Sequence, residues 1–330
     1  MRLEDKEITD FIVAARNTSH DCFITPDRVP TYDDISRFAE RTGLKTAVFL
    51  PGRLEQTDIN RICHNKNPFF FSSARISDPL LFASLEDSKF EELLLLSAEL
   101  AEQTEYGYQL GFTRIADQRA SSSYPLHLTA VLSGRGCSAN ERLLELFGCR
   151  DALVVGEAKI KLASELFSDE KHKFRALTEL AKGSAGRIAI ICTTRREAEL
   201  LSSYFSREKL EHTVFHGGKD EKALDNSLRN IIKGNVSKII ATKSLLQYAP
   251  FVPPYNTVCC GVPYSLSHAS RIKSLTHSVA EELKCFYCAD DVKTLLKLTE
   301  SYAKNFTQDA EHFISKRSTE LLEVLQNAGI

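Results

Sequence analysis

The chain has 330 residues, of which 43% are hydrophobic and 26% charged, and this mix is typical of a globular protein of about two domains. Its 42 basic and 44 acidic side chains give a net charge of -2, which excludes a protein that holds nucleic-acid phosphates by bulk charge alone. No apolar run approaches the ~18 residues of a membrane span, and residues 1–10 carry no secretory signal. We therefore expect an intracellular protein (cytoplasmic, nucleoid-associated or nuclear) without a membrane partner.

Short apolar runs alternate with amphipathic helical patterns along the chain, and such runs are typical of strands buried on both faces of a parallel sheet. In chain order, the expected strands are 22–25, 46–50, 68–72, 93–96, 126–132, 187–192, 213–216, 238–241, 257–262 and 283–288. Apolar residues at spacings of three and four predict helices over 140–148 and 195–209. This alternation predicts an α/β fold.

The composition changes at 157–169, where an apolar strand pattern gives way to a charged segment. We therefore expect two α/β domains, 1–157 and 158–302, joined by this segment. From residue 303 to residue 330, apolar side chains again recur at helical spacing. This pattern predicts a C-terminal helical segment packed on the second domain.

The nine cysteines are odd in number and scattered, which argues against a disulfide framework. Cys285 and Cys288 have the C-x-x-C spacing, but a zinc site takes four ligands and no cysteine follows Cys288. We expect this pair to lie in a buried strand, with no metal bound.

Several segments of the second half follow one another in a specific order. They are Cys192-Thr193-Thr194-Arg195 before a helical stripe, then Phe215-His216-Gly217-Gly218, then Ala241-Thr242 at the end of a strand pattern, then Val262-Pro263. The series over 174–300 resembles the second RecA-like domain of superfamily 2 helicases, most closely of the RecQ type. The resemblance implies two RecA-like parallel-sheet domains in tandem.

The first half resembles the same family more weakly. The segment 21–26 is similar to the strand before the family's phosphate loop, and 98–101 falls where the family has Asp-Glu-Ala-His. A phosphate loop needs glycine N–H groups, a lysine and a Ser/Thr. The matching loop, Asp27-Arg28-Val29-Pro30-Thr31, contains neither glycine nor lysine. The resemblance therefore implies a degenerate loop that binds no nucleotide, and we expect no cofactor.

The other groups of the motor are also missing. Ala98 stands where the family has the aspartate that holds Mg²⁺, and Glu99 is a remnant of the catalytic carboxylate. The family's arginine fingers would fall near Leu275 and Ser278. Because loss of one arginine finger costs on the order of 10³–10⁵ in rate, we expect no ATP hydrolysis.

Contacts to nucleic acid do not require this chemistry. In related helicases, N–H and hydroxyl groups at strand ends touch phosphates, contacts that position the chain without reading sequence. The resemblance places Thr194, Arg195, Thr242 and Lys243 at such ends. The alternative, which the sequence favours, is that Thr194 caps the helix that follows it. Basic residues such as Lys173 either line a groove or are simply solvated.

Three functions remain open. The favoured one is a non-catalytic RecQ-like pseudohelicase, a scaffold in DNA maintenance that binds a protein partner, DNA or RNA through a local patch, or both. The first alternative is a divergent but active ATP-dependent DNA helicase or translocase, which would use ATP and Mg²⁺. The second is a structural subunit without nucleic-acid contact, which the near-neutral charge favours over a free-standing DNA binder.

Overall fold

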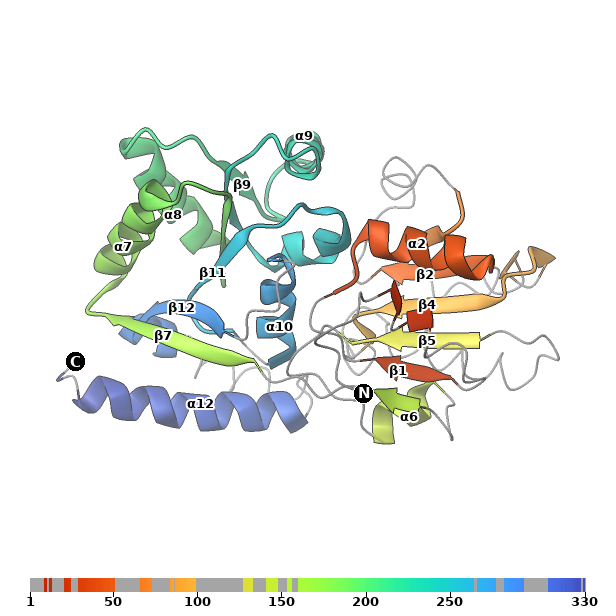
Figure 1. Cartoon of the computed structure of the whole chain (residues 1–330). Coiled ribbons are helices and arrows are strands. Elements are labelled where there is room, and N and C mark those ends of the chain that lie inside the picture. Colours follow the sequence, from red (N-terminus) through yellow and green to blue (C-terminus); the bar gives the residue numbers. More distant parts are fainter. Residues whose placement is uncertain are drawn as a thin grey trace. The chain divides into compact units, whose positions relative to one another are not determined.

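The chain divides into two compact units, Met1–Lys159 and Ile160–Ile330, each built round its own sheet (Figure 1). The division lies close to the predicted boundary after residue 157. The computed structural model describes residues 9–10, 12–13, 21–24, 29–50, 66–72, 84–85, 87–98, 127–132, 141–147, 153–155, 160–263, 266–276, 282–293, 308–327 and 329.

The first unit contains a six-stranded parallel sheet of order β3-β2-β4-β5-β1-β6. Its strands are β1 (Cys22–Ile24), β2 (Thr46–Leu50), β3 (Phe69–Ser72), β4 (Glu92–Leu96), β5 (His127–Val131) and β6 (Leu153–Val155). Helix α2 (Tyr32–Thr42) follows β1, and α6 (Glu141–Leu146) follows β5. In β1, Ile24 packs with Phe38 of α2, whereas Phe23 packs with Phe147 after α6. Because both faces are covered, the strand sequence is continuously apolar.

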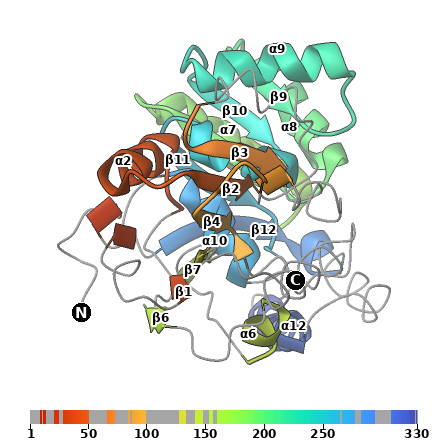
Figure 2. The ribbon, with the colours of Figure 1, turned by 90° about the vertical axis from the view of Figure 1, so that its right-hand side faces the viewer.

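The second unit contains another six-stranded parallel sheet, of order β7-β12-β11-β8-β10-β9. Its strands are β7 (Lys161–Phe167), β8 (Ile188–Cys192), β9 (Thr213–Phe215), β10 (Lys238–Ala241), β11 (Asn256–Cys260) and β12 (Glu282–Cys288). The helices between them are α7 (Glu170–Gly183), α8 (Arg195–Arg207), α9 (Glu221–Ile232), the 3₁₀ helix η5 (Lys243–Phe251) and α10 (Leu266–Ser274). Helix α9 packs beside β9, the edge strand (Figure 2). Cys285 and Cys288 lie buried in β12, as predicted.

The charged segment at 157–169 was expected to connect the domains, and this expectation is wrong for most of its length. Residues Lys161–Phe167 form β7, which pairs with β12 from Lys161 opposite Glu282 to Phe167 opposite Cys288. An edge strand tolerates exposed polar side chains, and every residue of β7 is exposed or only partly buried. Its sequence therefore lacks the apolar run by which the other strands are recognised.

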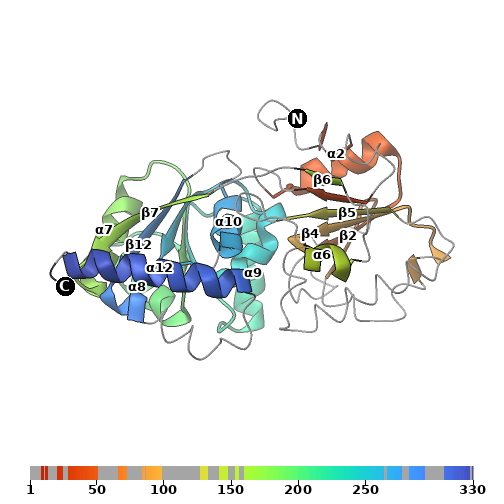
Figure 3. The same cartoon turned by 90° about the horizontal axis from the view of Figure 1, so that it is seen from below.

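The C-terminal helix α12 (Gln308–Asn327) packs on the second unit, as the apolar spacing predicts (Figure 3). Leu321 and Leu325 join a buried cluster with Val262, Tyr287 and Val292. The Arg317 guanidinium also donates a hydrogen bond to the Ser164 hydroxyl of β7. None of the helices in the described part of the chain has both the length and the hydropathy that a membrane crossing requires.

Candidate functional site

The sequence-predicted contact residues follow neighbouring strands of the second sheet. Because the strands are parallel, the segments after β11, β8, β10 and β9 all emerge at one edge of the sheet. Ligands of open α/β sheets bind at this carboxyl edge. The edge brings together Thr193–Arg195 after β8, His216–Gly218 after β9 and Thr242–Lys243 after β10.

Thr194 is the N-cap of α8. Its hydroxyl accepts a hydrogen bond from the N–H of Glu197 at 3.1 Å, and its own N–H donates to the Glu197 carboxylate at 3.0 Å. This reciprocal arrangement is a capping box, and the Thr-x-x-Glu spacing is its signal in the sequence. The capping role that the sequence left open for Thr194 is therefore present.

The exposed side chain of Arg195 lies across the glycine turn, His216–Gly218. A methyl group on Gly218 would lie 3.2 Å from Cδ of Arg195, and one on Gly217 would lie 3.6 Å from its Nη2. Glycine at both positions therefore lets the guanidinium group stay close to the backbone of the turn.

His216 ties the glycine turn to α8. Its Nδ1 accepts a hydrogen bond from the N–H of Gly218 at 3.1 Å, so its Nε2 carries the proton and donates to Glu199 at 2.8 Å. Lys219 contacts the same Glu199 oxygen at 2.6 Å. Hydrogen bonds from Lys219 and His216 lower the pKa of Glu199. The turn is thus held in place by a carboxylate that stays ionised at neutral pH.

The segment after β10 carries a buried threonine and an exposed lysine. Thr242 is 7% exposed, and its hydroxyl lies 3.1 Å from that of Ser244. Lys243 begins η5 and is exposed. Burial, with the charges of Arg271 and Lys243, lowers the pKa of His268 to about 3. Lys243 and Arg271 therefore bring positive charge to the same part of this edge, beside an imidazole that is neutral at pH 7.

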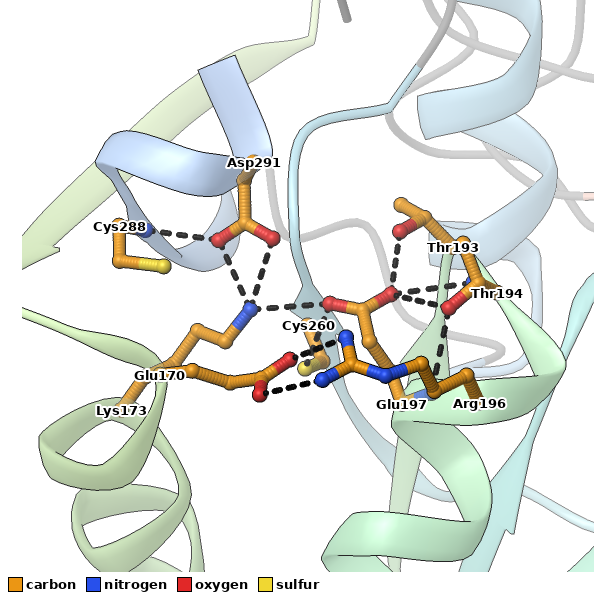
Figure 4. Close-up of polar contacts among 9 residues, drawn as sticks. All are labelled: Glu170, Lys173, Thr193, Thr194, Arg196, Glu197, Cys260, Cys288 and Asp291. Atoms are coloured by element: carbon orange, nitrogen blue, oxygen red, sulfur yellow. Dashed lines mark hydrogen bonds and ion pairs between the residues drawn. The ribbon is translucent and has the colours of Figure 1, made fainter. Parts of the chain in front are cut away.

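A network of buried ion pairs lies in the interior next to this carboxyl edge (Figure 4). Nζ of Lys173, on α7, donates to Oε1 of Glu197 at 2.9 Å and to both oxygens of Asp291 at 2.8 Å. Asp291 also accepts the N–H of Cys288 at 2.7 Å. Lys173 is 0% exposed and Glu197 is 4% exposed. The network therefore joins α7, the start of α8 and the short helical segment that follows β12.

The charges of this network are unequal, because one ammonium faces two carboxylates. The carboxylates Glu197 and Asp291 raise the pKa of Lys173 well above its ordinary value, despite its burial. Burial alone would raise the pKa of Glu197, but the charge of Lys173 and the Thr193 hydroxyl hold it below its ordinary value. Burial and repulsion from Glu197 raise the pKa of Asp291, in spite of Lys173. The pKa values of the two carboxylates are therefore shifted in opposite directions.

Sequence reasoning missed this network, and it was wrong about Lys173, which neither lines a groove nor is solvated. The available signal is its position: Lys173 lies four residues before Leu177 and eight before Ala181, on the buried stripe of α7. Arg196, the neighbouring basic residue, is exposed and pairs with Glu170 at 3.2 Å.

Residues 29–31, the described part of the loop that the resemblance matches to the family's phosphate loop, lead into a helix that caps itself. Val29 and Pro30 are buried, and Thr31 is the N-cap of α2. The Asp34 carboxylate is 1% exposed and accepts the N–H of Thr31 at 2.8 Å and its hydroxyl at 2.7 Å. Arg37 donates to the same carboxylate at 2.8 Å. A side-chain carboxylate thus occupies the helix N-terminus, the kind of place where phosphates bind.

Two other positions that the resemblance matches to the family's ATPase motifs, Ala98 and Leu275, are apolar. Ala98 is 0% exposed and belongs to the core of the first unit. Leu275 is 0% exposed in the second unit. Asp27, Arg28, Glu99 and Ser278 lie outside the described residues.

Comparison with known proteins identifies the fold. No family model matches the sequence. A crystal structure of the DUF1998 helicase MrfA bound to DNA and AMPPNP is similar with a TM-score of 0.61 at 10% identity, covering 90% of this chain and 50% of that one. Mss116p bound to ssRNA and AMP-PNP is similar with a TM-score of 0.55 at 15% identity, covering 89% and 65%. S. cerevisiae Dbp5 bound to RNA and ADP BeF3 is similar with a TM-score of 0.50 at 13% identity, covering 93% and 84%.

The chain spans half the length of the MrfA chain and about two thirds of that of Mss116p. At these identities the likeness establishes the fold alone. Both sheets are parallel, and helices connect their strands. The chain therefore has the α/β fold of tandem RecA-like helicase domains, as the sequence predicts.

Proposed function

We propose that this chain is a helicase-like scaffold of the RecQ type that binds nucleic-acid phosphates without hydrolysing ATP. The observation that carries the proposal is the Asp34 carboxylate at the N-terminus of α2. A phosphate placed there would meet a buried negative charge that already takes the N–H and hydroxyl of Thr31. Nucleotide binding would require Asp34 to leave and the capping box to open.

We expect ATP with Mg²⁺ to leave the melting temperature of the purified chain unchanged, and we expect no phosphate release. The reason is that the loop supplies no lysine or glycine, and that Ala98 supplies no metal ligand. Differential scanning fluorimetry and a phosphate-release assay test this, each with and without single-stranded and duplex DNA. A saturable nucleotide-dependent shift with stimulated hydrolysis would instead establish the active helicase.

The proposed nucleic-acid contact is the carboxyl edge of the second sheet. Arg195 over the glycine turn and Lys243 at the start of η5 are exposed cations on neighbouring segments of this edge. Phosphates are held by such side chains together with backbone N–H groups. The bound DNA of MrfA and the bound ssRNA of Mss116p make a nucleic-acid ligand the natural one to test.

We expect Arg195→Ala combined with Lys243→Ala to weaken binding of a single-stranded oligonucleotide and to flatten its salt dependence. The logarithm of the association constant falls linearly with the logarithm of the salt concentration, and each lost phosphate contact makes this negative slope shallower by about 0.7. Fluorescence anisotropy over a salt series measures both quantities, with DNA and RNA oligonucleotides of equal length. Lys233→Ala is the control. Lys233 is also an exposed cation, but it lies at the C-terminal end of α9, whereas the glycine turn precedes the N-terminal end of that helix. Absence of binding by the unmodified chain at low salt would favour the structural subunit.

A protein partner belongs to this proposal, because a chain without a motor acts through what it holds. Co-purification from the native host, with and without nuclease, tests this part. A partner that persists after nuclease treatment supports a protein scaffold, and loss of every partner contradicts it.

A further inference from the structure

We infer that Glu197 is a positioning residue for the nucleic-acid contact: it holds the β8 corner (Thr193–Arg195) so that Arg195 stays over the glycine turn. Glu197 does not itself face the ligand, because it is 4% exposed. This inference rests on the proposed function and names the group that maintains its site.

One carboxylate oxygen of Glu197 holds the corner. Oε2 accepts the N–H of Thr194 at 3.0 Å, the hydroxyl of Thr194 at 3.2 Å, and the hydroxyl of Thr193 (Figure 4). Hydrogen bonds to a charged acceptor are the strongest of their kind in proteins. The two residues before Arg195 are therefore fixed by a single atom.

The other oxygen anchors Glu197 to the interior. Oε1 accepts Nζ of Lys173 at 2.9 Å and the thiol of Cys260 at 3.8 Å. Lys173 is in turn held by Asp291. An isolated carboxylate at this depth would take up a proton and lose acceptor strength, and Lys173 prevents this. Glu197 thus links a rigid, charged interior to the exposed corner.

A second lysine–glutamate pair between the same two helices provides an internal comparison. Lys182 of α7 binds Glu208, the C-cap residue of α8, at 2.8 Å. Both side chains are partly exposed, 32% for Lys182 and 50% for Glu208. This pair also joins α7 to α8, but it lies at the other end of both helices. Glu208 is therefore a control for a charged contact between α7 and α8 that does not reach the β8 corner, whereas stability has to be separated from positioning by the measurements below.

The test compares Glu197→Gln with Glu208→Gln in the full chain. Glutamine keeps one oxygen, which Lys173 requires because an ammonium only donates. The NH₂ group then faces the Thr194 N–H and cannot accept it. We expect Glu197→Gln to weaken binding of a single-stranded oligonucleotide about tenfold, as loss of a charged hydrogen bond would. Glu208→Gln is expected to bind like the unmodified chain.

Two further measurements separate positioning from stability. If Glu197 acts through Arg195, combining Glu197→Gln with Arg195→Ala causes no further loss of affinity. The double variant then binds the oligonucleotide as well as the weaker of the two single variants. Amide exchange at Thr194 is expected to be faster in Glu197→Gln, with exchange in β10 unchanged. The inference is overturned if the losses of affinity of the two single variants multiply in the double variant. It is also overturned if Glu197→Gln binds the oligonucleotide normally while Arg195→Ala binds it more weakly. In either case the proposed function still stands.

If the unmodified chain binds no nucleic acid, the proposed function fails, and amide exchange alone decides whether Glu197 holds the corner. Faster exchange at Thr194 in Glu197→Gln then supports that part of the inference. Exchange equal to that of the unmodified chain overturns it.

Discussion

Replacing Lys173 by methionine is expected to lower the free energy of unfolding of the second unit by about 3–5 kcal/mol, since breaking a buried ion pair leaves uncompensated charge. Two carboxylates, Glu197 and Asp291, would remain inside with no cation. Urea unfolding followed by circular dichroism measures this loss, because the chain has no tryptophan to report it. Hydrogen exchange of peptides from β8 and β12 assigns the loss to the second unit.

The matched control for this change is Lys182→Met, on the same helix. Lys182 also contacts two carboxylates, Glu179 and Glu208, but on the surface. Exposed pairs contribute about 0–1 kcal/mol, so we expect little change. Equal losses from the two substitutions would contradict the importance of burial in this network.

The effect of Lys173→Met is expected to depend on pH in a defined direction. In the variant, both buried carboxylates lose their cation, so their pKa values in the folded state rise. A carboxyl pKa that is raised in the folded state destabilises that state fully above the raised pKa. The penalty then shrinks as the pH falls and disappears below the pKa of the unfolded chain. The difference in free energy of unfolding between the variant and the unmodified chain should therefore narrow as the pH falls from neutral.

Adding Asp291→Asn to Lys173→Met should recover part of the lost free energy of unfolding at neutral pH, because it removes one of the two buried negative charges. If the double variant recovers none of it, the excess of negative charge in this network is not what destabilises the variant.

Gly261→Ala is expected to be the second most damaging change. Gly261 follows β11 with φ +101°, where L residues are strained by about 1–3 kcal/mol. A methyl group there would lie 2.7 Å from Cγ2 and 2.9 Å from Oγ1 of Thr193. Thr193 cannot rotate away without losing its hydrogen bond to Glu197, so overpacking adds about 1–3 kcal/mol. Urea unfolding measures the loss, and amide exchange at Thr194 shows whether the β8 corner moves.

Gly43→Ala separates the backbone strain at Gly261 from its overpacking against Thr193. Gly43 ends α2 with φ +67°, and nothing lies within 4 Å of the position that its methyl group would take. Only the left-handed backbone is penalised, by about 1–2 kcal/mol. If Gly261→Ala costs no more than Gly43→Ala, the close approach to Thr193 contributes nothing.

Local patterns predicted most strands and the helices α6, α8 and α12, because burial on both faces requires continuous apolar runs and a helix on a sheet requires an apolar stripe. The same patterns failed at β7, where an edge strand meets solvent and keeps its polar residues. The capping box of Thr31 and Asp34 was within reach of the sequence, because its spacing is local. What it means for the phosphate loop depends on the burial of Asp34, which the spacing does not report.

That residues 27–31 contain neither lysine nor glycine can be read directly from the sequence, since it concerns only which groups the chain possesses. The partners of Lys173 cannot, because Glu197 and Asp291 are 24 and 118 positions away along the chain. Only the folding of α7 against the ends of β8 and β12 brings them together. Chemical identity and periodicity are local properties of a sequence, whereas the pairing of buried charges is a property of the packed chain.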